Sequence, residues 1–145
     1  MRVLGLDLGT KRIGVALSDS AGTMATPYDT VHRSGDRRRD HRRIAELAVE
    51  AEVEAVIVGL PLSLDGSDGP AAKKARREAG EIGRATGLPV ELWDERLTTV
   101  TADRELMAMD LKADARRRMV DMVAASVMLQ AWLDHRRLTA EVPPA

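Results

Sequence analysis

The sequence contains no cysteine, which excludes disulfide bonds, thiolate metal sites and a cysteine nucleophile together. A chain without cysteine suits a reducing cytoplasm. No long apolar stretch and no signal-peptide pattern directs it to a membrane. We therefore expect a cytoplasmic protein that has no membrane partner.

Aromatic side chains are scarce as well: the chain has no phenylalanine, one tyrosine and two tryptophans. The core must be aliphatic, and stacking of bases on an aromatic platform is not expected. The chain also lacks an excess of one charge, because 22 Lys and Arg residues are matched by 23 Asp and Glu residues. Without an overall basic field, contact with nucleic acid would depend on local patches that bind phosphates.

The 145 residues suffice for one compact domain. Apolar runs predict strands at residues 3–6, 13–17, 25–31, 55–59 and 90–94. Apolar spacing, capping residues and breakers predict helices at 36–52, 71–86, 98–109 and 114–137. This order predicts an α/β fold whose mixed five-stranded sheet has three antiparallel strands, then parallel strands, and flanking helices. We expect one domain over residues 1–138 and a flexible tail over 139–145.

Three acidic residues stand where an isolated carboxylate would be costly. Asp7 ends a buried strand, Asp94 and Glu95 stand together at the end of the last strand, where at most one of them can face a given site, and Asp121 interrupts an apolar helix. A buried charge must be paired, hydrogen-bonded or bound to a cation. Carboxylate oxygens suit Mg²⁺ or Mn²⁺, and two such ions roughly 4 Å apart can activate water and stabilise the leaving oxygen of a phosphodiester. The combination of three acids favours such a site.

Each acid also has an ordinary structural explanation. Asp7 can cap the turn that follows it. Glu95 can cap a helix or form an ion pair. Arg117 and Arg118 stand four and three residues before Asp121 and could neutralise it.

The turn after the first strand supplies possible phosphate ligands. Gly9 permits a close backbone approach, and the next three residues carry donors: Thr10, Lys11 and Arg12. An ordinary hairpin turn explains the same residues as well.

Basic residues gather in three segments. Six arginines and two aspartates within residues 33–43 give a net local charge of +4, and further patches occupy residues 73–77 and 116–118. Arginine suits phosphate oxygens, although a run of charge is more often a solvated surface. The histidines have no metal-ligand spacing and are assigned no role: His32, His41 and His135.

Four motifs in order resemble the YqgF family, also called RuvX, of small bacterial proteins with a ribonuclease H-like (RNase H-like) fold. They are LDLGTKRIGVA at residues 6–16, VGLPL at 58–62 with DGS at 65–67, DERLTT at 94–99, and VD at 120–121 with AA at 124–125. The resemblance covers nearly the whole chain. It implies metal-dependent cleavage of nucleic acid, described for the family both as Holliday-junction resolution and as maturation of the 16S rRNA precursor.

The resemblance also implies roles for individual residues. Asp7, Glu95 and Asp121 would be catalytic and would hold Mg²⁺ or Mn²⁺. Four residues would contact the phosphates of the substrate: Thr10, Lys11, Arg12 and Arg96. The partner would be precursor rRNA or branched DNA, bound by a monomer or a homodimer.

The expected sheet separates two of these acids. One strand should lie between those that lead to Asp7 and Glu95, so their ends are roughly 10 Å apart at about 4.8 Å per strand. Glu95 must then reach back across the strand ends or act through water on a second metal. If Glu95 points away, Asp94 becomes the candidate.

Two other function classes fit parts of the sequence. The Asp-x-Gly-Thr turn also resembles the phosphate-binding turn of actin-like ATPases and sugar kinases, but those need two such lobes and this chain has one. A non-catalytic RNA-binding ribosome-assembly factor would retain the acids for folding. Loss of cleavage on replacing Asp7, with binding retained, would distinguish a nuclease from that factor.

Overall fold

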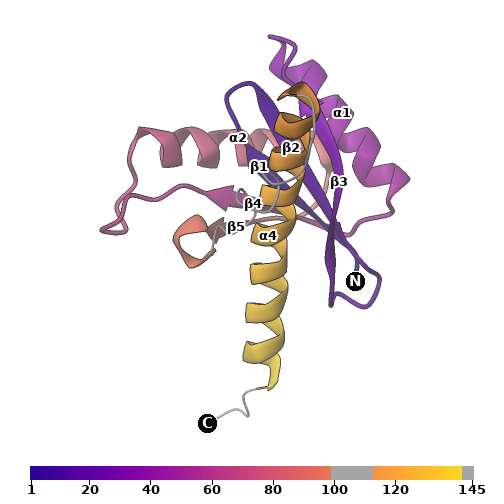
Figure 1. The fold of residues 1–145 in the computed structure, drawn as a ribbon, viewed down its shortest axis with the longest axis vertical. Helices are drawn as coiled ribbons and strands as arrows, with labels where there is room; N and C mark the ends of the chain where they lie inside the picture. The colour runs from indigo at the N-terminus through magenta and orange to yellow at the C-terminus, as the bar shows by residue number, and fades with distance from the viewer. Residues whose placement is uncertain (99–112, 142–145) are drawn as a thin grey trace.

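A computed structural model describes residues 1–98 and 113–141 of the chain (Figure 1). The strands form one sheet in the order β3-β2-β1-β4-β5. They are β1 (Val3–Leu8), β2 (Arg12–Ser18), β3 (Ala25–His32), β4 (Ala55–Leu60) and β5 (Val90–Asp94). The helices are α1 (Arg37–Glu50), α2 (Pro70–Thr86), the short 3₁₀ helix η1 (Glu95–Leu97) and α4 (Ala113–Glu141).

The sheet is mixed, as the order of elements predicts. β1 pairs antiparallel with β2 and β2 with β3, whereas β1 pairs parallel with β4 and β4 with β5. Pro27 lies in the edge strand β3, where its missing N–H is tolerated, and the ladder shifts register opposite it. The predicted α/β architecture is confirmed.

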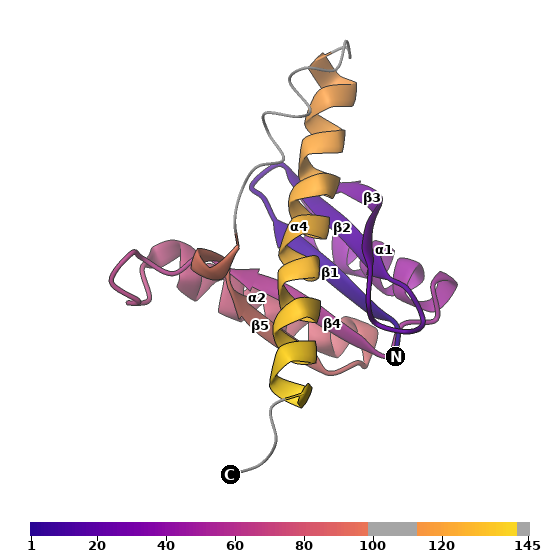
Figure 2. The same cartoon turned by 60° about the horizontal axis from the view of Figure 1, so that its bottom comes forward.

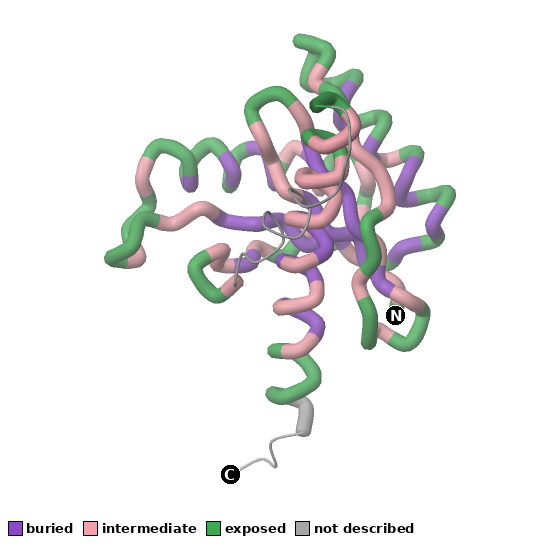
Figure 3. The backbone as a smooth tube through the Cα atoms, viewed as in Figure 1, coloured by how far each residue is buried: buried purple, intermediate pink, exposed green. Residues whose placement is uncertain are grey.

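Helices cover both faces of the sheet (Figures 1 and 2). Leu4 and Leu6 of β1 pack in the core beneath α1 and α2, while Val3 packs in a second core beneath α4. This split follows from the two-residue alternation of side chains along a strand. Figure 3 shows the buried backbone concentrated between the layers.

The helix α4 lies close against the centre of the sheet. A Cβ added at Gly5 of β1 would stand 2.9 Å from the Cβ of Leu129 in α4. Only a residue without a side chain fits at this crossing. The close approach brings the first half of α4 to the strands that carry the candidate site.

Helix boundaries agree with the sequence except near the C-terminus. Asp36 caps α1 by accepting hydrogen bonds from the backbone N–H groups of Arg38 and Arg39. The helix α4 continues to Glu141, which is three residues into the segment expected to be a tail. The helix expected over residues 98–109 falls almost wholly outside the described residues. Among the helices that the structure describes, none is long and apolar enough to cross a membrane.

Candidate active site

The carboxyl ends of the three parallel strands meet at one edge of the sheet. Leu6 of β1 is in register with Val58 of β4, so the next residues, Asp7 and Gly59, lie side by side one residue before their strands end. Glu95 follows directly after β5, the neighbour of β4. Ligand sites in such sheets form at this edge, because the strands end there and the loops diverge.

Glu95 reaches back over β4 toward Asp7. The sequence alone did not determine whether Glu95 or Asp94 would do so. A Cβ added at Gly59 would collide with Oε1 of Glu95. The missing side chain of Gly59 is therefore the space that the Glu95 carboxylate occupies. Asp94 instead caps η1 and forms an ion pair with Arg96 at 2.6 Å, away from this space. The geometry thus favours Glu95 over Asp94.

Asp121 reaches the same area from the opposite side. In the β1–β2 ladder Asp7 stands opposite Gly14, and a Cβ added at Gly14 would collide with the backbone carbonyl oxygen of Asp121. The backbone of α4 therefore touches β2 next to Asp7. A glycine at this point allows one helical carboxylate to approach the strand carboxylate.

Mutual repulsion and burial raise the pKa values of two of these acids. The pKa of Asp7 is raised by burial and by the charge of Asp121. Burial and the charges of Asp7 and Asp94 raise the pKa of Glu95 to about 7. Within residues 1–98 and 113–141, neither the Asp7 nor the Glu95 carboxylate has a hydrogen bond or an ion pair. Two neighbouring carboxyl groups with raised pKa values are typical of a functional site.

Asp121 has a partner that the sequence did not suggest. The Nε of Arg12 donates to Oδ2 of Asp121. Arg117 lies 3.8 Å from Asp114 instead, and the carbonyl of Arg118 accepts from Thr30. Arg12, expected at a phosphate, therefore neutralises a candidate ligand in this structure.

The other expected phosphate contacts are arranged differently. Arg96 donates to both carboxylate oxygens of Asp94 and to the carbonyl of Leu64. Thr10 and Lys11 are exposed in the turn after β1, and Thr10 lines the cavity described next.

A cavity of about 390 Å³ opens at this edge of the sheet. Asp7 and Glu95 lie in its lining together with Thr10. Three cationic side chains line it as well. They are Arg33, which follows β3, Arg37 of α1 and Lys74 of α2. The cavity therefore combines carboxylates that can hold a cation with cations that can hold a phosphate.

An ion-pair network beside the cavity was missed from the sequence. The guanidinium of Arg33 donates two hydrogen bonds of 2.8 Å to Glu78 and one of 2.7 Å to the carbonyl of Gly9. Nε2 of His41, to which the sequence assigned no role, lies 2.8 Å from the same glutamate. Burial opposes ionisation of Glu78, but the hydrogen bonds from Arg33 and His41 lower its pKa.

A signal for this network was present. Glu78 stands three residues after Ala75 and four before Ile82, on the buried face of α2. A charged residue on an apolar helical face needs a partner, which is the argument that singled out Asp121. Nothing in the sequence identifies Arg33 and His41 as the partners.

The fit of a divalent metal ion is partial. Asp7 and Glu95 supply hard oxygen donors, and a cation would relieve the repulsion that raises their pKa values. In the described part of the chain, no group of three or more acidic or histidine side chains is arranged to hold a metal ion. Of the expected trio, Asp7 and Glu95 line one cavity, whereas Asp121 is held by Arg12.

Comparison with known proteins identifies a family that this chain matches. Residues 1–135 match the family model described as "RuvX: Holliday junction resolvase". A Myxococcus xanthus protein named "Putative pre-16S rRNA nuclease" is 48% identical over 94% of this chain and 90% of its own length. An Anaeromyxobacter protein of the same name is 50% identical over 94% of this chain and 98% of its own.

Solved structures support the fold. The Thermus thermophilus RuvC chain, solved in complex with a Holliday junction substrate, superposes with a TM-score of 0.57 at 17% identity. The match covers 94% of this chain and 96% of that one. The likeness confirms the RNase H-like fold expected from the sequence.

Proposed function

The chain belongs to the RuvX family, and we propose that it is a metal-dependent nuclease that hydrolyses phosphodiester bonds in structured nucleic acid. The observation that carries the proposal is the pair of carboxylates, Asp7 and Glu95, which have no partner among residues 1–98 and 113–141 and lie in one cavity that also presents cations. The names of the relatives favour precursor 16S rRNA as substrate, and the family description favours a Holliday junction. The reducing cytoplasm, where either substrate would be met, suits the cysteine-free chain.

Asp7 and Glu95 would hold the Mg²⁺ or Mn²⁺, with Asp121 joining them if Arg12 moves to a substrate phosphate. A bound ion supplies Lewis-acid activation of water and stabilisation of the leaving oxygen. The protein's own cations have a separate task. Lys74 draws phosphates into the cavity and offsets their charge near the carboxylates, whereas Arg33 and Arg37 are paired with Glu78 and Glu81.

The buried network has a positioning role in this proposal. Arg33 holds the carbonyl of Gly9, two residues after Asp7, and Glu78 holds Arg33. These bonds fix the turn that follows the catalytic strand. Preorganisation of this kind reduces the cost of aligning groups at the moment of reaction.

Cleavage of two labelled substrates in parallel tests the proposal. A four-way DNA junction and a precursor 16S rRNA fragment are incubated with Mg²⁺ or Mn²⁺ and either the wild type or Asp7→Asn. We expect cutting of at least one substrate by the wild type and none by the variant, because Asp7 is central to the acidic group. Asp94→Asn is the matched control, since Asp94 is tied to Arg96 outside the cavity.

The outcome also separates the main alternative. Tight binding of either nucleic acid without cleavage by the wild type, in either metal, would contradict the nuclease and favour a non-catalytic RNA-binding assembly factor.

A further inference from the structure

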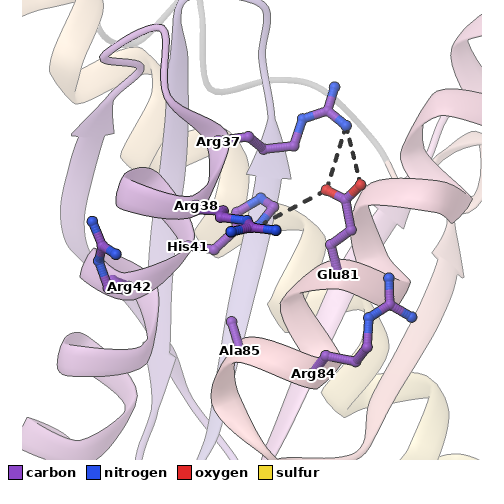
Figure 4. A pocket seen from close by; sticks show the side chains of 7 residues that line it. All are labelled: Arg37, Arg38, His41, Arg42, Glu81, Arg84 and Ala85. Atoms are coloured by element: carbon purple, nitrogen blue, oxygen red, sulfur yellow. Dashed lines mark hydrogen bonds and ion pairs between the residues drawn. The ribbon is translucent and has the colours of Figure 1, made fainter.

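A second cavity, of about 700 Å³, lies between α1 and α2. Figure 4 shows Arg37 and His41 reaching from α1 toward Glu81 of α2. The charged and titratable side chains that line this α1–α2 groove are Arg37, Arg38, His41, Arg42, Glu81 and Arg84. The lining contains four arginines and one acid, so its charge is strongly positive.

Most of that charge is not neutralised by other residues that the structure describes. Arg37 uses Glu81, to which it donates hydrogen bonds of 3.2 and 3.3 Å. Arg38, Arg42 and Arg84 are exposed, and none of them has an ion pair among the described residues. Bringing exposed cations of one sign together is unfavourable unless a counter-charge binds.

A neighbouring arginine on the same helix shows the contrast. Arg43 lies 3.1 Å from Glu46, 3.4 Å from Asp29 and 3.7 Å from Glu50. Its guanidinium is therefore occupied by carboxylates on the side of α1 away from the groove. Among the residues that the structure describes, Arg38, Arg42 and Arg84 have no such carboxylates.

The groove continues into the candidate active site. Arg37 lines both the groove and the cavity that contains Asp7 and Glu95. Beneath the junction, His41 in the groove and Glu78 in the cavity share a contact of 2.8 Å, and both are buried. The two hollows therefore share a wall with a rigid buried support.

We propose that the α1–α2 groove binds the phosphodiester backbone of the substrate away from the bond that is cut, with Arg38, Arg42 and Arg84 as its phosphate contacts. This inference rests on the proposed function, because it assigns a second part of the same substrate. Arg38 and Arg42 are one helical turn apart, about 6 Å between Cβ atoms, so they suit separate phosphates better than one chelated anion. The described lining of the groove contains no Phe, Tyr or Trp, and its one ring, His41, is buried against Glu78, which favours recognition of the backbone over stacking of bases.

The salt dependence of binding tests the groove. Affinity for the labelled four-way junction and for the precursor rRNA fragment is measured over a range of salt concentrations in an Asp7→Asn background, which prevents cleavage. Arg38→Gln/Arg42→Gln should reduce the log–log slope by about 1.4 to 1.8, since each phosphate contact contributes about 0.7 to 0.9. Arg84→Gln, from the other helix, should reduce it by about half as much.

Arg39→Gln/Arg43→Gln is the matched control. It removes two arginines with the same spacing from the same helix but outside the groove. Its slope should equal that of the parent. In the cleavage-competent chain, the groove pair should raise KM more than it lowers kcat, and the control pair should change neither.

Each outcome decides the inference separately from the nuclease proposal. The binding role of the groove would be contradicted if the parent and both double variants had equal slopes, or if both double variants reduced the slope equally. This holds even if cleavage is observed. A reduction limited to the groove variants supports the groove, and would do so even if the wild type failed to cut. Failure of the parent chain to bind either nucleic acid would overturn both proposals.

Discussion

Two glutamates line the same cavity but have opposite electrostatic surroundings. Glu78 of α2 has a lowered pKa, because Arg33 and His41 hold its ionised form despite burial. Glu95 of η1 has a pKa raised to about 7, because burial and Asp7 act on it without any cationic partner in the described residues. The partners, rather than burial, distinguish a structural glutamate from one that is available to a ligand.

The comparison predicts opposite effects on stability. Ionised Glu78 stabilises the fold, and that contribution is lost as the pH falls through and below the usual range of a glutamate. Glu95 stabilises the fold in its protonated form, which is complete below pH 4.5 and is lost as the pH rises through about 7. The following substitutions test these signs.

Glu78→Gln should have the largest effect. Removing this charge leaves the largely buried Arg33 guanidinium without its counter-ion, at a cost of roughly 3 kcal/mol in the free energy of unfolding. Urea denaturation at pH 7 measures the loss, and Glu91→Gln, an exposed glutamate of β5 with no ion pair among the described residues, is the control. A change no larger than that of the control would show that the network does not stabilise the fold.

Magnesium should stabilise the wild type through Asp7 and Glu95, which have no partner in the part of the chain that the structure describes. At a tenfold excess over the dissociation constant, the free energy of unfolding rises by about 1.4 kcal/mol. Thermal denaturation with and without Mg²⁺ detects the shift without relying on activity. Glu78→Gln should retain the increment and Asp7→Asn should lose most of it; an equal increment in Asp7→Asn would contradict binding at this site.

Glu95→Gln should stabilise the metal-free protein. At pH 8 the substitution removes a partly buried charge that is repelled by Asp7, so the free energy of unfolding should rise by about 1 kcal/mol, less than the full shift because water screens the group. Denaturation in EDTA from pH 5 to 8 provides the measurement. The wild type should lose stability over this range more steeply than Glu95→Gln; parallel curves would indicate that Glu95 does not titrate there.

Asp94→Asn should have the smallest effect. The carboxylate is partly exposed, and its ion pair with Arg96 is local. Unfolding and cleavage should both stay close to wild-type values, in contrast to Glu95→Gln, which should lose cleavage. Loss of cleavage in Asp94→Asn to the same degree would transfer the catalytic assignment to Asp94.

Local sequence patterns were sufficient for most of the fold. The β-branched run at residues 55–59 became the buried strand β4, and the apolar spacing around Ile44 and Leu47 became the buried face of α1. The ends of helices were harder to predict. The helix α4 runs to Glu141, beyond its expected end, because apolar spacing of three and four residues does not mark where an exposed helix stops.

The candidate site was only partly predictable. Asp7 and Asp121 were identified because a charge in apolar sequence is conspicuous, whereas Glu95 was chosen over Asp94 through the family resemblance. In the structure, that choice depends on which of the two side chains has room over β4. Gly59 provides that room, and it lies in β4, whereas Asp94 and Glu95 stand at the end of β5. The metal, substrate and catalytic roles of Asp7, Glu95 and Asp121 stay predictions, to be tested as described above.

The sequence by itself determined the elements, their order and the positions of the acids, because hydrophobic periodicity and turn residues act over a few neighbours. Only the tertiary structure decided which charges meet. Arg33 and Glu78 are 45 residues apart, and Arg12 and Asp121 are 109 residues apart. Their pairing depends on strand register and on the close approach of α4 at Gly14, which no local pattern encodes.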